Sequence, residues 1–237
     1  MSSGYEYVGS ELELFAHAKN WKRYMLSELR DYLRGDVLEV GAGIGGTTQA
    51  LCTGEQASWT CLEPDAALLK SLQDSLDGAT YKKPPRMPVV GGTVADLPPD
   101  VRYDAILYID VLEHIEDDAA ELRGCVERLR PGGNLVVLAP AHQRLFSEFD
   151  AAIGHFRRYN RAMMRALTPP GLKLVRLRYL DSVGLLASAG NRLLLRSKMP
   201  TIGQIRFWDR AMVPCSRLLD VLTTHRIGKS ILGVWQR

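Results

Sequence analysis

Cysteine is scarce in this 237-residue sequence, which has 4 cysteines and no Cys-x-x-Cys pair. The cysteines are scattered, and no histidine accompanies them at the spacing of a metal site. This pattern argues against a disulfide-stabilised scaffold and against a cysteine-based zinc site. We interpret the four cysteines as buried or half-buried thiols in a reducing compartment; they are Cys52, Cys61, Cys125 and Cys215.

Long apolar runs are also missing. The most apolar late segment, residues 183–195, is interrupted by Asn191 and Arg192 and is shorter than the ~20 residues that cross a bilayer. Residues 1–13 lack a basic stretch followed by an apolar core, so no secretory signal is recognisable. We therefore expect a cytoplasmic protein.

Acidic residues are nearly absent from the last third of the chain. Residues 155–237 hold 16 of the 30 basic residues but only 3 of the 27 acidic ones. Such a segment attracts phosphates, anionic lipid surfaces or nucleic acid. The alternative is a solvated helical face on which arginine stems cover apolar surface.

A glycine-rich turn follows the first apolar segment, with glycines at positions 41, 43 and 45. Glycine allows close approach of a ligand, and the next helix start offers free N–H groups. A dinucleotide site favours Gly-x-Gly-x-x-Gly, which this spacing does not match. Glu39 precedes the turn and would repel phosphates, but it suits a cofactor that carries ammonium and sulfonium groups.

Acidic residues also follow the next predicted strands. A second apolar segment ends at Glu63, in the position that binds ribose hydroxyls, and a third is followed by Asp96, which suits an adenine amino group. A fourth strand, residues 103–109, opens into Asp110. The alternation of strands and helical segments up to residue 139 predicts a parallel sheet with right-handed crossovers.

This combined pattern resembles the class I S-adenosylmethionine-dependent methyltransferases, in the subset related to small-molecule and lipid methyltransferases. The resemblance is strong over residues 20–140 and rests on topology elsewhere. It implies an α/β, Rossmann-like fold whose seven-stranded, mostly parallel sheet has an antiparallel last strand. It also implies S-adenosylmethionine as cofactor and S-adenosylhomocysteine as product.

In that family the glycine turn holds the methionyl part, the acid matching Glu63 holds the ribose, and the position matching Asp96 holds the adenine. The segment after the fourth strand lies over the methionyl part and faces the acceptor. The cofactor-binding residues implied are Glu39, Gly41, Ala42, Gly43, Gly45, Glu63, Pro64, Asp96, Leu97, Ile109 and Asp110.

We expect one domain over residues 1–237, because the chain is long enough for one α/β core with modest additions. Its predicted parts are N-terminal helices over residues 1–35, a cofactor-binding core over 36–140, a lid over 141–170, and a helical cap insertion over 181–229. The pattern of the cap predicts two or three amphipathic helices, broken near Pro200 and Pro214. It could cover a long or apolar acceptor, lie on a membrane surface, or form a dimer interface.

The candidate catalytic residues are those able to act as a base or orient an acceptor, namely His114, His142, His155 and Tyr159. The candidate substrate-binding residues are Tyr7, Trp21, Arg144, Arg157 and Arg158. The structural alternatives are that Trp21 is a core aromatic, that His114 only helps to close the cofactor pocket, and that an arginine of the lid pairs with Glu148 or Asp150. No Asp/His cluster at metal spacing is recognisable, so we expect no metal.

The leading hypothesis is a methyltransferase that acts by in-line displacement on an oxygen or nitrogen of a small-molecule acceptor, with an anionic group as one option. Two alternatives stay open: a lipid-linked or membrane-associated acceptor, and a cofactor-binding protein that docks by its basic cap and has little catalysis. A nicotinamide oxidoreductase is disfavoured by Glu39 and the glycine spacing. A nucleic-acid methyltransferase is disfavoured because the Asn-Pro-Pro-Tyr type of motif is absent.

Overall fold

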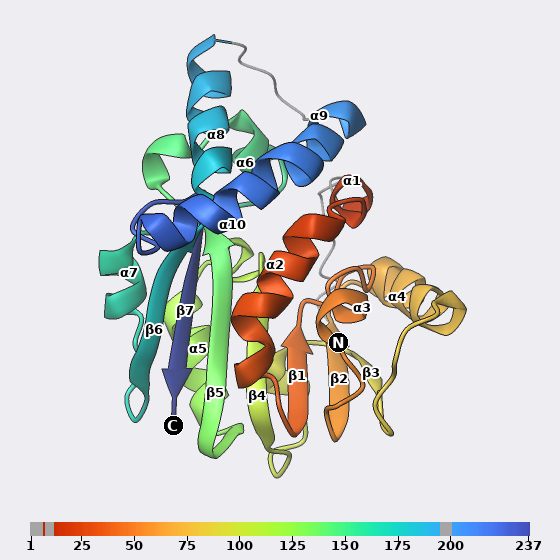
Figure 1. Ribbon diagram of the computed structural model, residues 1–237. Coiled ribbons are helices and arrows are strands. Elements are labelled where there is room, and N and C mark those ends of the chain that lie inside the picture. The colour runs from red at the N-terminus through yellow and green to blue at the C-terminus, as the bar shows by residue number, and fades with distance from the viewer. Residues whose placement is uncertain (1–6, 8–11, 195–200) are drawn as a thin grey trace.

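A seven-stranded sheet in the order β3-β2-β1-β4-β5-β7-β6 organises the chain (Figure 1). The computed structural model describes residue 7 and residues 12–194 and 201–237. Neighbouring strands from β3 to β5 run parallel, whereas β7 is antiparallel to both β5 and β6. The predicted mostly parallel sheet with an antiparallel last strand is confirmed.

The central strands are buried along almost their whole length because helices cover both faces of the sheet. In β1, four of five positions are buried, and β2 is buried throughout. The strands are β1 (Asp36–Val40), β2 (Ser58–Glu63), β3 (Val89–Gly91), β4 (Tyr103–Ile109), β5 (Leu129–Pro140), β6 (Lys173–Leu180) and β7 (Ser230–Gln236).

Helices lie on both sides of this sheet and build a separate apolar core on each. The first core packs Trp21 and Leu72 against the sheet, and the second packs Leu122 and Met164 against the opposite face. The helices are α1 (Leu12–Ala16), α2 (Lys19–Leu29), α3 (Thr48–Leu51), α4 (Ala66–Gly78), α5 (Asp118–Val126), α6 (Glu148–Ala152), α7 (Arg161–Ala166), α8 (Ser182–Leu194), α9 (Ile202–Phe207) and α10 (Val213–Leu222). Among the described residues, none of these helices combines the length and apolarity of a membrane span.

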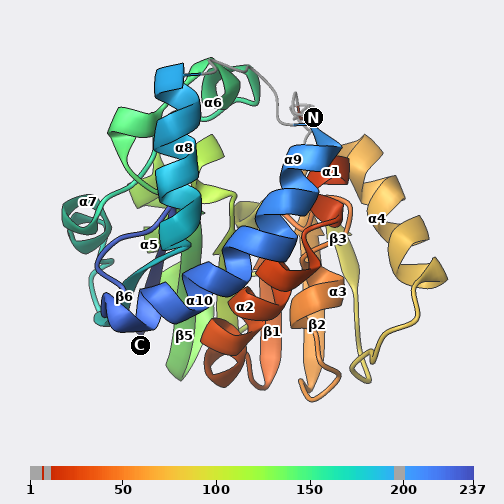
Figure 2. The ribbon, with the colours of Figure 1, turned by 45° about the horizontal axis from the view of Figure 1, so that its top comes forward.

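The predicted cap insertion consists of α8, α9 and α10. The expected break near Pro214 is wrong: a π-helical turn, Trp208–Met212, joins α9 to α10, and the two run on in one line (Figure 2). Pro214 stands in the first turn of α10, directly after the π-helical turn, and the helix runs on through it. The break expected near Pro200 lies outside the described residues.

Buried carboxylates attach the cap to the rest of the protein. Asp181 accepts hydrogen bonds from Trp208 Nε1 at 2.8 Å and Ser216 Oγ at 2.6 Å. Asp209 accepts from the Trp21 backbone at 2.9 Å, which caps the start of α2. Asp220 accepts from the Tyr24 hydroxyl, also on α2, at 2.8 Å.

These aspartates are the only three acidic residues after position 154, and each is at most 3% exposed. The basic residues Arg206, Arg210 and Arg217 are exposed on the cap. The cap therefore has no exposed acidic side chain to offset its surface arginines.

Candidate active site

A cavity of about 1750 Å³ opens at the carboxyl ends of the parallel strands, where ligands bind in open α/β sheets. The turn after β1, the ends of β2 and β4, and the segment after β5 form its floor. Residues of α1, α6, α8 and α9 line its outer part. Figure 2 looks down on this covered edge of the sheet.

The glycine-rich turn forms one wall of the cavity. Gly41 has φ of 69°, and a Cβ there would stand 2.6 Å from Val111 Cγ2, so only glycine lets the turn lie against the segment after β4. Gly43 has φ of 56° and donates its N–H to Glu63 Oε2 at 2.8 Å. The turn is thereby held to the end of β2.

Glu63 lies on the cavity wall with its carboxylate fixed from two sides. Besides the bond from Gly43, Oε1 accepts the backbone N–H of Asp65 at 3.0 Å. Burial raises the pKa of Glu63, and the two backbone hydrogen bonds oppose that shift. Since each carboxylate oxygen can accept a second hydrogen bond, Glu63 can still bind a pair of hydroxyls.

Glu39 lies beneath the glycine turn and outside the cavity lining. Its Oε2 accepts hydrogen bonds from Thr48 Oγ1 at 2.6 Å and Trp59 Nε1 at 2.8 Å. Burial raises the pKa of Glu39 to about 7, despite these two bonds. Its structural role is to tie the start of α3 to β2 rather than to face a ligand.

Replacing Glu39 with glutamine is expected to change how stability depends on pH. The folded pKa of about 7 exceeds the ordinary value of 4.5, so the folded protein holds this proton more tightly. The resulting stabilisation is complete below pH 4.5 and is lost as pH rises through 7, in total about 3 kcal/mol. Glutamine keeps an acceptor oxygen but does not titrate. In denaturant unfolding at pH 5 and pH 8, the wild type should therefore lose more stability than Glu39→Gln; parallel losses would contradict the buried, titrating Glu39.

Other predicted cofactor residues divide into two groups. Those that line the cavity, besides the turn and Glu63, are Ala42, Pro64, Ile109 and Asp110. Asp96 is exposed and accepts hydrogen bonds from the N–H and hydroxyl of Thr93, both at 2.8 Å, while Gly92 and Thr93 line the cavity in its place. Leu97 packs in the core, and Gly45 faces Leu72 of α4.

Residues before β1 also reach the cavity. Tyr7, whose backbone N–H bonds to Asp65 at 2.7 Å, and Trp21 both line it, as the substrate-site prediction requires. Sequence reasoning missed Lys22, whose ammonium group lies 3.0 Å from the position of a Cβ on Gly46. It places a positive charge at the glycine turn.

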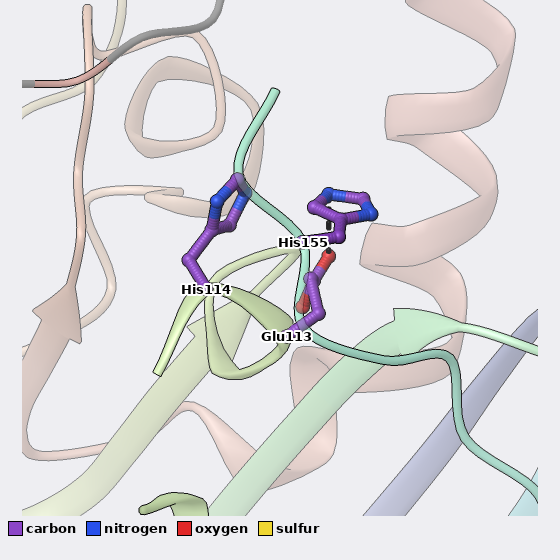
Figure 3. Close-up of side chains that lie close together, drawn as sticks. All are labelled: Glu113, His114 and His155. Carbon is purple, nitrogen blue, oxygen red and sulfur yellow. Dashed lines mark ion pairs between the residues drawn. The ribbon is translucent and has the colours of Figure 1, made fainter. Parts of the chain in front are cut away.

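Two of the predicted catalytic histidines meet at the cavity wall, one from the segment after β4 and one from the lid. The rings of His114 and His155 stand edge to face with centroids 4.5 Å apart, and Nε2 of His155 is 3.8 Å from Oε1 of Glu113 (Figure 3). Burial, and secondarily His155, lowers the pKa of His114 to about 4, so this imidazole is neutral near pH 7. Burial raises the pKa of Glu113 well above its ordinary value, and Asp110 adds to the shift. Glu113 was not among the predicted site residues.

Backbone hydrogen bonds join the lid segment 154–159 to Glu113 and to the end of β5. Phe156 donates its N–H to the Glu113 carbonyl at 2.8 Å, and Tyr159 donates to the Pro140 carbonyl at 2.9 Å. These bonds bring His155 beside the short 3₁₀ turn Leu112–His114 that follows β4. Residues 41 positions apart therefore share one wall of the cavity.

Asp150 organises the same segment from inside. Arg158 contacts it through Nε at 2.7 Å and Nη2 at 3.0 Å, and His155 Nδ1 lies 3.0 Å from its Oδ1. Burial raises the pKa of Asp150, but the His155 and Arg158 hydrogen bonds outweigh it and hold the pKa below its ordinary range. Arg158 lines the cavity, yet its ion pair with Asp150 fixes the lid, as the structural alternative anticipated.

The remaining predicted residues of the lid lie away from the cavity. His142 Nε2 hydrogen-bonds with the Gly228 carbonyl at 3.0 Å, and the buried Tyr159 hydroxyl donates toward Asp118 at 2.8 Å. Arg157 pairs with the same Asp118 at 2.7 Å, and Arg144 is exposed. The structure therefore does not bring these four residues to the cavity wall as a catalytic or substrate-binding group.

The cap supplies an apolar and aromatic roof. Phe207, Trp208 and Met212 line the cavity from the α9 side, and Phe146 and Phe149 line it from the lid. Lys229, a further lining residue missed in the sequence, lies with its Nζ 5.2 Å from the centre of the Trp208 ring. The cavity thus joins a polar, glycine-rich wall to an apolar chamber that contains one lysine from the start of β7.

Residues 38–135 match the family described as "Methyltransferase domain". A demethylmenaquinone methyltransferase of Tropheryma whipplei is 28% identical over 135 residues, which cover 56% of this chain and 53% of that protein. A ubiquinone biosynthesis O-methyltransferase of Xanthomonas campestris is 34% identical over 103 residues, which cover 42% of this chain and 40% of that protein. The chain thus spans about half the length, or less, of these relatives.

The fold is shared over nearly the whole chain with known structures. A putative methyltransferase from Bacillus halodurans superposes with a TM-score of 0.60 at 14% sequence identity, covering 89% of this chain and 97% of that one. The family match ends at residue 135, before the lid and cap.

Proposed function

We propose that this chain is a class I S-adenosylmethionine-dependent methyltransferase and that it transfers a methyl group from this cofactor to an oxygen atom of a small, largely apolar acceptor. The observation that carries the proposal is the single cavity that joins the glycine turn and Glu63 to the His114–His155 wall. A pocket for one drug-sized ligand measures roughly 300–1,000 Å³. The cavity of about 1750 Å³ has room for a cofactor and an acceptor together.

The polar wall suits the cofactor. Glu63 would accept the two ribose hydroxyls, and the backbone from Gly41 to Thr47 would hold the methionyl part, whose carboxylate finds Lys22 nearby. S-adenosylmethionine supplies a methyl group on a positively charged sulfur, so the leaving group needs no activation. The work left to the protein is to align the acceptor for displacement and exclude water.

The apolar chamber suits an acceptor with a hydrophobic body. Phe207, Trp208 and Phe149 offer rings for stacking, and Lys229 offers one positive charge for an anionic substituent or a developing oxyanion. The choice of oxygen is supported by the Xanthomonas relative, whose name states an O-methyltransferase. It is also supported by the titratable wall of Glu113, His114 and His155, since a hydroxyl must lose a proton when it is methylated.

A lipid-linked acceptor is the second candidate, favoured by the outer face of the cap. Leu218 and Leu222, one helical turn apart on α10, are 67% and 71% exposed. The neighbouring Arg210 and Arg217 are exposed and have no surface acid on the cap to neutralise them. Apolar side chains beside arginines are typical of helices that lie on anionic membrane surfaces.

Transfer of a labelled methyl group to a defined panel tests both candidates. We expect methylation of a catechol that carries an isoprenoid tail, slower methylation of the untailed catechol, and none of its dimethyl ether. Presenting the tailed catechol in anionic rather than neutral vesicles should raise the rate if the cap binds the membrane. Methylation of amines but not of hydroxyls would contradict the oxygen assignment, and bound cofactor without any transfer would favour the non-catalytic alternative.

A further inference from the structure

The Glu113 carboxylate is buried without a hydrogen-bond partner. Its side chain is 0% exposed, and neither Oε1 nor Oε2 has a partner among the described residues. A carboxyl group left in this state costs several kcal/mol relative to one in water. Its Oε1 points toward His155, at 3.8 Å from Nε2 (Figure 3). A cation beside this carboxylate would offset that cost.

Asp150 fixes which nitrogen of His155 faces Glu113. Because a carboxylate at this distance can only accept, Nδ1 carries the hydrogen that is donated to Asp150 Oδ1 at 3.0 Å. In the neutral ring the lone pair then lies on Nε2, the nitrogen nearest Glu113. A histidine that binds a metal through one ring nitrogen usually donates the N–H of the other to an acceptor such as a carboxylate.

We propose that Glu113, His114 and His155 bind one divalent transition-metal ion at the acceptor side of the cavity. One ligand atom from each residue can be chosen so that all lie within 4.8 Å of one another. Ligands of a bound zinc ion, at about 2.0–2.2 Å from the metal, are closer than this, so small side-chain rotations complete the site. Two imidazoles and one carboxylate suit zinc, cobalt, manganese or iron better than magnesium or calcium.

Three protein ligands leave coordination positions for an acceptor oxygen. Since all three residues line the cavity, those positions are accessible to a ligand in the apolar chamber. A hydroxyl bound to the ion loses its proton to solvent at lower pH than the free hydroxyl. Its oxygen then forms the bond to the methyl carbon while the carbon–sulfur bond breaks and the electron pair goes to sulfur, giving a methyl ether, S-adenosylhomocysteine and one released proton. This role rests on the proposed function, whereas binding of the ion does not.

Metal titration of the tag-free, full-length protein after dialysis against a chelator tests the site. We expect one Zn²⁺ per chain by calorimetry, and one Co²⁺ per chain with visible absorption of a nitrogen- and oxygen-ligated ion. His155→Ala and the near-isosteric Glu113→Gln should each weaken binding by at least about 100-fold. Asp150→Asn, which leaves the ligands in place, should weaken it by about 10–100-fold.

His142→Ala is the matched control, because His142 bonds to Gly228 and lies outside the cluster. It should bind Zn²⁺ as the wild type does. Failure of Zn²⁺, Co²⁺ and Mn²⁺ to bind, or binding that survives both Glu113→Gln and His155→Ala, would overturn the proposal. Calorimetry with S-adenosylhomocysteine on the same preparations separates the two hypotheses: cofactor binding without metal binding defeats the metal site alone, and metal binding without cofactor binding defeats the proposed function.

Discussion

Replacing Glu63 with alanine is expected to weaken S-adenosylhomocysteine binding by about 100-fold. Hydrogen bonds to a charged acceptor contribute about 1.5–3 kcal/mol each, so losing two from the ribose costs about 3 kcal/mol or more. The substitution also removes the acceptor of the Gly43 and Asp65 backbone N–H groups, which loosens the glycine turn. Isothermal titration calorimetry of the two proteins measures the loss directly.

Asp74→Ala is the control for this experiment, because Asp74 is an exposed carboxylate on α4. It should bind S-adenosylhomocysteine with the wild-type affinity. Circular dichroism should show that Glu63→Ala remains folded. If a folded Glu63→Ala protein bound within threefold of the wild type, the end of β2 would not be the ribose site.

Replacing Arg158 with alanine is expected to lower the free energy of unfolding by about 3–5 kcal/mol. The substitution leaves the Asp150 carboxylate, which is fully buried, without the guanidinium that contacts it twice. Removal of one member of a buried ion pair costs this amount because the other charge stays buried without its counter-ion. Denaturant unfolding at neutral pH gives the difference.

Arg157→Ala is a closely matched comparison, one residue away on the same segment. Arg157 pairs with Asp118 at 2.7 Å, but its side chain is 22% exposed and water can replace the lost contact. We expect a loss of about 1 kcal/mol or less. Equal losses for the two arginines would show that Asp150 does not organise the lid.

The core of the fold was predictable because parallel strands covered on both faces must be apolar and must end in turns. The glycine at position 41 marks the end of β1, and Glu63 marks the end of β2. Strand ends at one edge of a sheet meet in space, so their polar residues could be assigned to one site. The antiparallel last strand came from the family resemblance and is confirmed.

The direction in which the lid residues point was not predictable. Histidine and tyrosine side chains can bind a ligand or hydrogen-bond within the protein. His142 and Tyr159 do the latter, bonding to Gly228 and Asp118. Arg158 faces Asp150 because the helix α6 carries that carboxylate inward, a fact of packing that residue type does not reveal. In the same way, the pairing of Glu113 with His155 depends on a backbone hydrogen bond from Phe156.

The charge asymmetry of the chain also has a physical explanation that emerges only from the fold. The last third of the chain has three acids, and all are buried and accept hydrogen bonds that hold the cap in place. They are Asp181, Asp209 and Asp220. No surface carboxylate is left on the cap to balance its arginines. The sequence shows an excess of basic over acidic residues in the last third of the chain. The fold shows that this excess is greater at the surface, because the acidic residues are buried.

A crystal structure with bound S-adenosylhomocysteine tests the central claim most directly. Our account predicts that the ribose hydroxyls bond to Glu63, that the amino-acid part lies in the turn after β1, and that the sulfur faces the wall formed by His114 and His155 across the empty part of the cavity. A ligand that binds with its sulfur turned away from that wall, or outside this cavity, would contradict the assignment of the acceptor site.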